Sequence, residues 1–171
     1  GIVDAAGAIA TAIIIKAVLL WVHGLDLNTF IAIAAGFIVS QAMLVLVTRI
    51  KEKQYANNNQ GDCMQEAFAD GQTALAIRYA GQVISTALAV TAASYFLTYS
   101  PDTIIMNLLG WLMFSVIMTV LVFVLTTIAK KLILWGINLV EEVDQQHNIG
   151  VASVEMAISI SIALILTGLM A

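Results

Sequence analysis

Five apolar stretches constrain this chain more than any other feature of its sequence. Each is about as long as the roughly 20 residues that an α-helix needs to cross the hydrocarbon core of a bilayer. In lipid, a single chain segment can satisfy its own backbone polar groups only as a helix, so stretches of this length predict membrane helices. The stretches are residues 2–22, 29–50, 73–97, 103–129 and 149–170.

The composition agrees with a membrane protein. Of the 171 residues, 61% are hydrophobic and only 11% are charged, which leaves too little polar surface for a soluble domain. The seven basic residues are spread along the chain, so nothing resembles a nucleic-acid-binding surface. The one cysteine, Cys63, cannot form an internal disulfide, and we place it in a polar loop on the reducing side of the membrane.

The first stretch, residues 2–22, has the length of a membrane helix but contains Asp4 and Lys16. Asp4 would lie near one interface, and Lys16 can extend its apolar stem toward the helix end at Trp21. We interpret this stretch as a fifth spanning helix. A tilted helix that lies in the membrane interface is the alternative.

Basic residues predict the orientation of the chain in the membrane. Lysines and arginines flank the loop 50–71 and open the loop 130–148, whereas the short connections 23–28 and 98–102 contain none. Loops that carry an excess of these residues stay in the cytoplasm. We therefore expect the two long loops to be cytoplasmic and the short connections and the C-terminus to lie outside.

The second half of the chain resembles the first. When the sequence is aligned with itself at an offset of 76 residues, Ile84 meets Ile160, and both halves share an order of elements. A long helix with a basic end is followed by a polar loop and a helix rich in small residues. Two such units run in the same direction, as parallel repeats related by an axis along the membrane normal.

The sequence thus predicts an all-α fold, a polytopic transmembrane helical bundle made of two parallel two-helix repeats plus an N-terminal helix. We expect the small-residue helices of the two repeats to form its packed centre, because small side chains allow close helix approach. The expected units are an N-terminal membrane helix and outer loop (1–28), a first repeat (29–99) and a second repeat (100–171).

Gln72 and Asn148 stand at the start of the two small-residue helices. An amide side chain at a helix N-terminus can satisfy backbone N–H groups that have no partner within the helix, and asparagine does so better than glutamine. We predict that both residues cap their helices.

Two features resemble a known family. The pattern Asn-x-Ala/Gly-x-Ala starts one small-residue helix and recurs at the start of the other with Gln72 in the place of asparagine, and residues 104–132 read IIMNLLGWLMFSVIMTVLVFVLTTIAKKL. Both are similar to the bacterial inner-membrane family called domain of unknown function 350, the YjfL-like proteins. The likeness covers residues 29–171. Residues 1–22 look like an additional helix, and Gln72 departs from the asparagine that the family favours.

The resemblance implies a multi-pass protein of the bacterial inner (cytoplasmic) membrane, with no defined biochemical activity and with paired two-helix repeats. It also connects the chain with envelope stress and with ion conduction. Neither implication follows from the composition or the spacing of residues.

Arg78 and Glu155 are charged residues within apolar helices, where a charge is costly. Arg78, Gln82 and Ser85 share one helix face, Glu155 and Ser159 share another, and the repeat alignment puts both charges at one depth. We interpret Arg78 and Glu155 most simply as an ion pair, within one subunit or between neighbours. Alternatively, each charge snorkels to the surface, or Glu155, Ser159, Arg78 and Gln82 line a proton or cation site. These four residues and Ser85 make up the predicted intramembrane polar site.

A polar stripe also follows the stretch 103–129. Asn107, Ser115, Thr119 and Thr126 fall along one side of the predicted helix. We favour hydrogen bonds between helices over the lining of a pore.

No phosphate-binding loop, nucleophile elbow or zinc-ligand spacing is present, so we expect no enzyme, no catalytic residue, no cofactor and no metal. Two functions remain in view. One is a homo-oligomeric ion-conducting channel. The other is an accessory membrane subunit that docks a membrane or cytoplasmic protein through the acidic segments QEAFADGQ and EEVDQQHN. The expected partners are the lipid bilayer and further copies of the chain, without nucleic acid.

Overall fold

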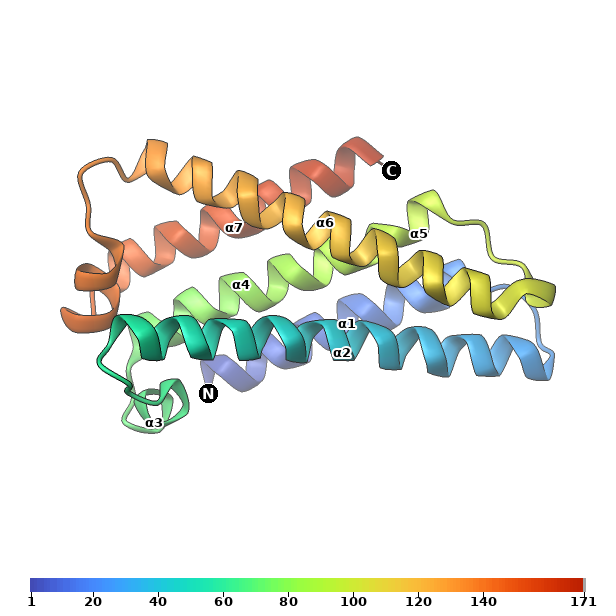
Figure 1. The fold of residues 1–171 in the computed structure, drawn as a ribbon, viewed down its shortest axis with the longest axis horizontal. Helices are drawn as coiled ribbons and strands as arrows, with labels where there is room; N and C mark the ends of the chain where they lie inside the picture. The colour runs from blue at the N-terminus through green and yellow to red at the C-terminus, as the bar shows by residue number, and fades with distance from the viewer. Residues whose placement is uncertain (171) are drawn as a thin grey trace.

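The computed structural model describes residues 1–170, and within them it contains helices and no strand (Figure 1). The predicted all-helical bundle is confirmed. Two short helices, η1 and η2, lie in the loops, and η2 is a π-helical turn. The elements are α1 (Ile2–Trp21), α2 (Leu27–Asn58), α3 (Met64–Ala69), α4 (Thr73–Thr91), α5 (Ala93–Phe96), η1 (Pro101–Thr103), α6 (Ile104–Ile133), η2 (Glu141–Gln145) and α7 (Ile149–Met170).

Five of these helical segments are long and apolar enough to cross a membrane, which supports a multi-pass membrane protein. They run back and forth between two ends of the bundle. We call the end that holds segments 59–72 and 134–148 the long-loop end, and the end that holds segments 22–26 and 97–103 the short-loop end (Figure 1). α2 continues to Asn58, beyond the predicted stretch 29–50, so its basic end extends into the long-loop end.

α4 is the central helix of the bundle. It packs against α1, α2, α6 and α7, and it is buried over most of its length. α7 packs along α4 but turns its other side outward, with Leu164, Ile165 and Leu169 exposed. The two helices expected to form the packed centre are therefore buried to different extents, because α1 covers the side of α4 that lies away from α7.

Glycine allows the closest approach between α4 and α7. A Cβ atom added at Gly81 would lie 2.6 Å from the Cα of Met156, far inside van der Waals contact. Ala74 on α4 and Ala152 on α7 are also fully buried between the helices, where they pack with Val143. These contacts fit the close helix approach expected from the small residues.

α1 belongs to the bundle. It buries one residue every three or four positions along its length, and Asp4 and Lys16 point outward from this buried face. A helix lying across the membrane interface would not run along α4 in this way. The packing therefore supports a spanning α1.

An aromatic layer fills the core near the short-loop end. The rings of Trp21 and Trp111 lie 4.7 Å apart, centroid to centroid. The indole Nε1 of Trp21 donates to the carbonyl of Leu97 at 2.8 Å, and that of Trp111 donates to the Ser40 hydroxyl at 3.0 Å. Because Trp111 is fully buried, this end of the bundle is tightly packed.

Candidate functional site

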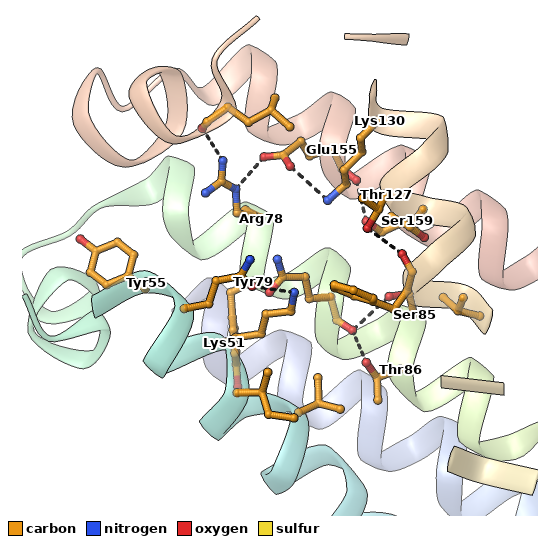
Figure 2. A pocket seen from close by; sticks show the side chains of 18 of the residues that line it. Lys51, Tyr55, Arg78, Tyr79, Ser85, Thr86, Thr127, Lys130, Glu155 and Ser159 are labelled. Carbon is orange, nitrogen blue, oxygen red and sulfur yellow. Dashed lines mark hydrogen bonds and ion pairs between the residues drawn. The ribbon is translucent and has the colours of Figure 1, made fainter. Parts of the chain in front are cut away.

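A cavity of about 530 Å³ lies at the long-loop end, between α2, α4, α6 and α7. Its lining contains all five residues that the sequence predicts as an intramembrane polar site, and Figure 2 shows most of them from close by. The structure thus brings these residues together from two helices, α4 and α7. They are Arg78, Gln82, Ser85, Glu155 and Ser159.

Arg78 is the centre of a buried charge cluster. Its Nε donates to Glu155 Oε2 at 2.6 Å, its Nη1 to Asp144 Oδ1 at 2.5 Å, and its Nη2 to the carbonyl of Leu139 at 2.5 Å. Lys130 Nζ lies 3.1 Å from the other oxygen of Glu155 (Figure 2). The ion pair between Arg78 and Glu155, which the sequence favours, is formed within one chain.

The charges of this cluster balance. Arg78 and Lys130 face Asp144 and Glu155, and the side chains of the two acids are only 2% and 4% exposed. Ionised groups are tolerated at such burial when each has a partner and further hydrogen bonds. The cluster therefore explains how Glu155 can lie in an apolar helix.

Asp144 ties the two long loops together. It lies on η2, and its Oδ2 accepts a hydrogen bond at 3.3 Å from Asn59, the residue that follows α2. Burial raises the pKa of the Asp144 carboxyl, and the neighbouring Arg78 guanidinium and Asn59 amide offset only part of that effect. The cluster thus joins α4 and α7 to both loops.

Two further lysines reach the cavity without joining the cluster. Lys51 Nζ lies 4.6 Å from the centroid of the Phe123 ring and 3.2 Å from Gln54 Oε1, and Lys131 is exposed at the rim. Among residues 1–170, neither lysine makes an ion pair. With four basic and two acidic side chains in its lining, the cavity carries a formal charge of +2.

The polar stripe of α6 divides into two parts. Asn107 donates to the carbonyl of Ser100, and Ser115 donates to the carbonyl of Val90 on α4. Thr119 and Thr126 line the cavity, and their buried hydroxyls have no hydrogen-bond partner among residues 1–170. A buried hydroxyl without a partner costs about 1–3 kcal/mol, so these two groups favour a polar occupant of the cavity.

The two seryl hydroxyls of the predicted site are engaged within their own helices. Ser85 donates to the carbonyl of Gln82, and Ser159 donates to the carbonyl of Glu155. Their oxygen atoms can still accept a hydrogen bond. In the described part of the chain, no group of three or more His, Cys, Asp and Glu side chains could hold a metal ion.

The two predicted caps differ. Asn148 Oδ1 accepts the backbone N–H of Val151 at 3.1 Å, and its Nδ2 donates to Glu142 at 2.7 Å. Gln72 makes no such bond to α4, and its buried Oε1 has no partner in the described residues, so the cap expected there is not formed. The extra methylene of glutamine makes it a poorer cap than asparagine.

Comparison with known proteins identifies the family. A family model described as Domain of Unknown Function (DUF350) matches residues 21–170. The chain belongs to the DUF350 family. Searches of curated proteins and of solved structures gave no match. The DUF350 match covers every residue of the cavity, and it begins at the last residue of α1, so this helix precedes the family region.

Within the DUF350 region, sequence reasoning missed the site roles of Lys51, Lys130 and Asp144. The two lysines carried a signal, because both stand at the basic ends of membrane helices, but that signal was used only for orientation. Asp144 lies in an acidic loop segment and gives no periodic pattern of its own. Its role depends on a fold that brings it to Arg78, 66 residues away in the sequence.

Proposed function

We propose that this DUF350 protein binds an anionic ligand in the cavity at its long-loop end and does not transform it chemically. The observation that carries the proposal is the excess of basic side chains in the lining. Asp144 and Glu155 are occupied by Arg78 and Lys130, which leaves Lys51 and Lys131 to attract an anion. The hydroxyls of Thr119 and Thr126 supply further hydrogen-bonding capacity.

We also propose that the protein lies in the bacterial inner membrane with its long-loop end in the cytoplasm and its C-terminus in the periplasm. The support is the position of the basic residues, because five of the seven stand at the long-loop ends of α2 and α6. In this orientation, the ligand is bound near the cytoplasmic face. The five residues are Arg49, Lys51, Lys53, Lys130 and Lys131.

The two functions that the sequence brought into view receive less support. Conduction through one chain would need a path along the whole bundle, but the cavity reaches only to Ala89 and Thr119. Val90, Trp111 and Met118 are buried in the layer beyond. A pore between copies of the chain, which assumes a homo-oligomer, stays a prediction.

Docking of a partner protein through the acidic loop segments also stays a prediction. The segment EEVDQQHN uses its acidic side chains largely within the chain. Asp144 bonds to Arg78 and Asn59, and Glu142 accepts a hydrogen bond from Asn148. Fewer free carboxylates therefore remain for a partner than the sequence suggests.

Thermal unfolding in mild detergent tests the proposed function. Inorganic phosphate should raise the unfolding temperature more than sodium chloride of equal ionic strength, because ligand at 100 times its Kd stabilises a protein by about 2.7 kcal/mol. Lys51→Gln should abolish the difference. Lys53→Gln, on the same helix but exposed and outside the cavity lining, should keep it. An equal response of all three proteins would contradict the proposal.

A further inference from the structure

We infer that the anionic ligand is the phosphate headgroup of a membrane lipid, which enters the cavity sideways from the bilayer between α2 and α6. This inference rests on the proposed function, since it names the ligand class of the same cavity. Free phosphate offers the same charge chemistry. The surroundings of the cavity favour the lipid as the source.

The two helices that bound the cavity on its outer side separate toward the long-loop end. Figure 1 shows α2 and α6 close together near the short-loop end and diverging toward the long-loop end. Residues of both helices line the cavity, which also contacts α4 and α7. The cavity therefore lies where α2 and α6 part.

Part of the rim between α2 and α6 is apolar, next to Lys51. Ile50 on α2 and Val120 and Phe123 on α6 line the cavity, and these residues are 55%, 55% and 50% exposed. These exposed residues lie in helices that are long and apolar enough to span a membrane, so we expect acyl chains beside Val120 and Phe123, with Ile50, between Arg49 and Lys51, at the boundary of the hydrocarbon layer. An acyl chain can lie against such apolar side chains. A free inorganic anion gains nothing from contact with them.

The polar end of the cavity suits a phosphate group. Figure 2 shows Lys51 on one wall and Lys130, with Glu155, on the opposite wall. Lysine ammonium groups at the ends of membrane helices bind lipid phosphates, and basic pockets between such helices bind anionic headgroups. The Thr126 hydroxyl, in a side chain only 8% exposed, is an additional donor without a partner among residues 1–170.

The cavity has a charged end near the loops and an apolar side between α2 and α6. Its charged side chains gather toward the loops, at Lys51, Lys131 and Asp144. Its apolar lining on α2 and α6 is formed by Val47, Val120, Val122 and Phe123, whereas the hydroxyls of Ser85, Thr86 and Thr119 stay available to polar atoms of the ligand. A headgroup at the level of the lysines would place its acyl chains along the opening between α2 and α6. The headgroup then contacts the lysines, and the acyl chains contact the apolar side chains of the opening.

Native mass spectrometry of the protein reconstituted in nanodiscs tests this inference. The nanodiscs contain phosphatidylcholine with a minor fraction of phosphatidylglycerol, and the protein is released in mild detergent. Wild-type protein should retain one phosphatidylglycerol per chain. Lys51→Gln should lower this retention about tenfold or more, the effect expected for one charge-assisted hydrogen bond, and Lys53→Gln should not. Retention that is equal in both variants would reflect surrounding lipid only and would overturn the inference.

A second variant separates the lipid from free phosphate. Val120→Trp fills the apolar rim, so it should reduce retention of phosphatidylglycerol while leaving the thermal response to inorganic phosphate intact. Ile50→Trp, on the opposite side of the opening, serves if Val120→Trp does not fold. A wild-type protein that responds to phosphate through Lys51 but retains no phospholipid overturns the lipid inference and leaves the proposed function standing. A response to neither ligand overturns both.

Discussion

Replacing Arg78 by methionine removes the centre of the buried charge cluster but keeps most of the side-chain volume. Three acceptors then lose the hydrogen bond from Arg78, namely the carboxylates of Asp144 and Glu155 and the carbonyl of Leu139, and among residues 1–170 the carboxylates keep only Asn59 and Lys130 as partners. The Arg78 side chain is only 14% exposed, so solvent screens these contacts little. Removal of one partner from a buried ion pair costs about 3–5 kcal/mol, and we expect Arg78→Met to lower the free energy of unfolding by this amount at neutral pH.

Unfolding in mixed detergent micelles, followed by circular dichroism, measures this change. Arg49→Met is the matched control, because Arg49 pairs with Glu52 on the same helix and its side chain is 73% exposed. Surface pairs of this kind contribute about 0–1 kcal/mol. If the two variants unfold within about 1 kcal/mol of each other, the cluster does not stabilise the fold as we argue.

Three further predictions concern packing, pH and capping. Gly81→Ala forces a methyl group against the backbone of α7 and should lower the free energy of unfolding by about 1–3 kcal/mol or more. Gly168→Ala is the control, because its added methyl group meets no atom within 4 Å and should not destabilise the protein. Equal effects of the two changes would contradict the packing of α4 on α7. Because burial raises the pKa of Asp144, the folded protein takes up this proton at a higher pH than the unfolded chain does. The free energy of unfolding of the wild type relative to Asp144→Asn should therefore increase as the pH falls from about 7 toward about 4, and a decrease would contradict the sign. Asn148→Ala should lower the unfolding temperature, because it removes a cap that contributes about 1 kcal/mol. Gln72→Ala should change the unfolding temperature much less, because Gln72 makes no capping bond. A larger effect of Gln72→Ala than of Asn148→Ala would refute the assignment of the caps.

The membrane helices could be predicted from the sequence because the signal is local. An apolar run of about 20 residues satisfies its backbone in lipid only as a helix, whatever its neighbours are. The polar tract at residues 57–62 also marks the place where α2 ends, at Asn58. The length of α2 beyond Ile50 was less predictable, since its charged last turns continue into the long-loop end without an apolar pattern.

The arrangement of the helices was harder to predict from the sequence. The repeat predicts equivalent roles for α4 and α7, but α1 packs on α4, which is the helix buried over most of its length among residues 1–170. Nothing in the sequence of residues 2–22 says which helix they cover. The repeat itself stays a prediction.

The site was predicted in part, and for a physical reason. Arg78 and Glu155 stand out because a charge in a membrane helix requires a partner. Asp144 and Lys51 do not stand out, since charged residues in loops and at helix ends are ordinary. Their role depends on how the loop 134–148 folds over α4 and on how far α2 and α6 diverge.

The most direct test of the central claim is a crystal structure grown in a lipid mesophase that contains phosphatidylglycerol with brominated acyl chains. Anomalous scattering from bromine locates the chains independently of the protein. We predict bromine between α2 and α6, beside Val120 and Phe123, with the headgroup near Lys51. Bromine only at other outer surfaces, together with α2 and α6 packed closely along their whole length, would contradict the account.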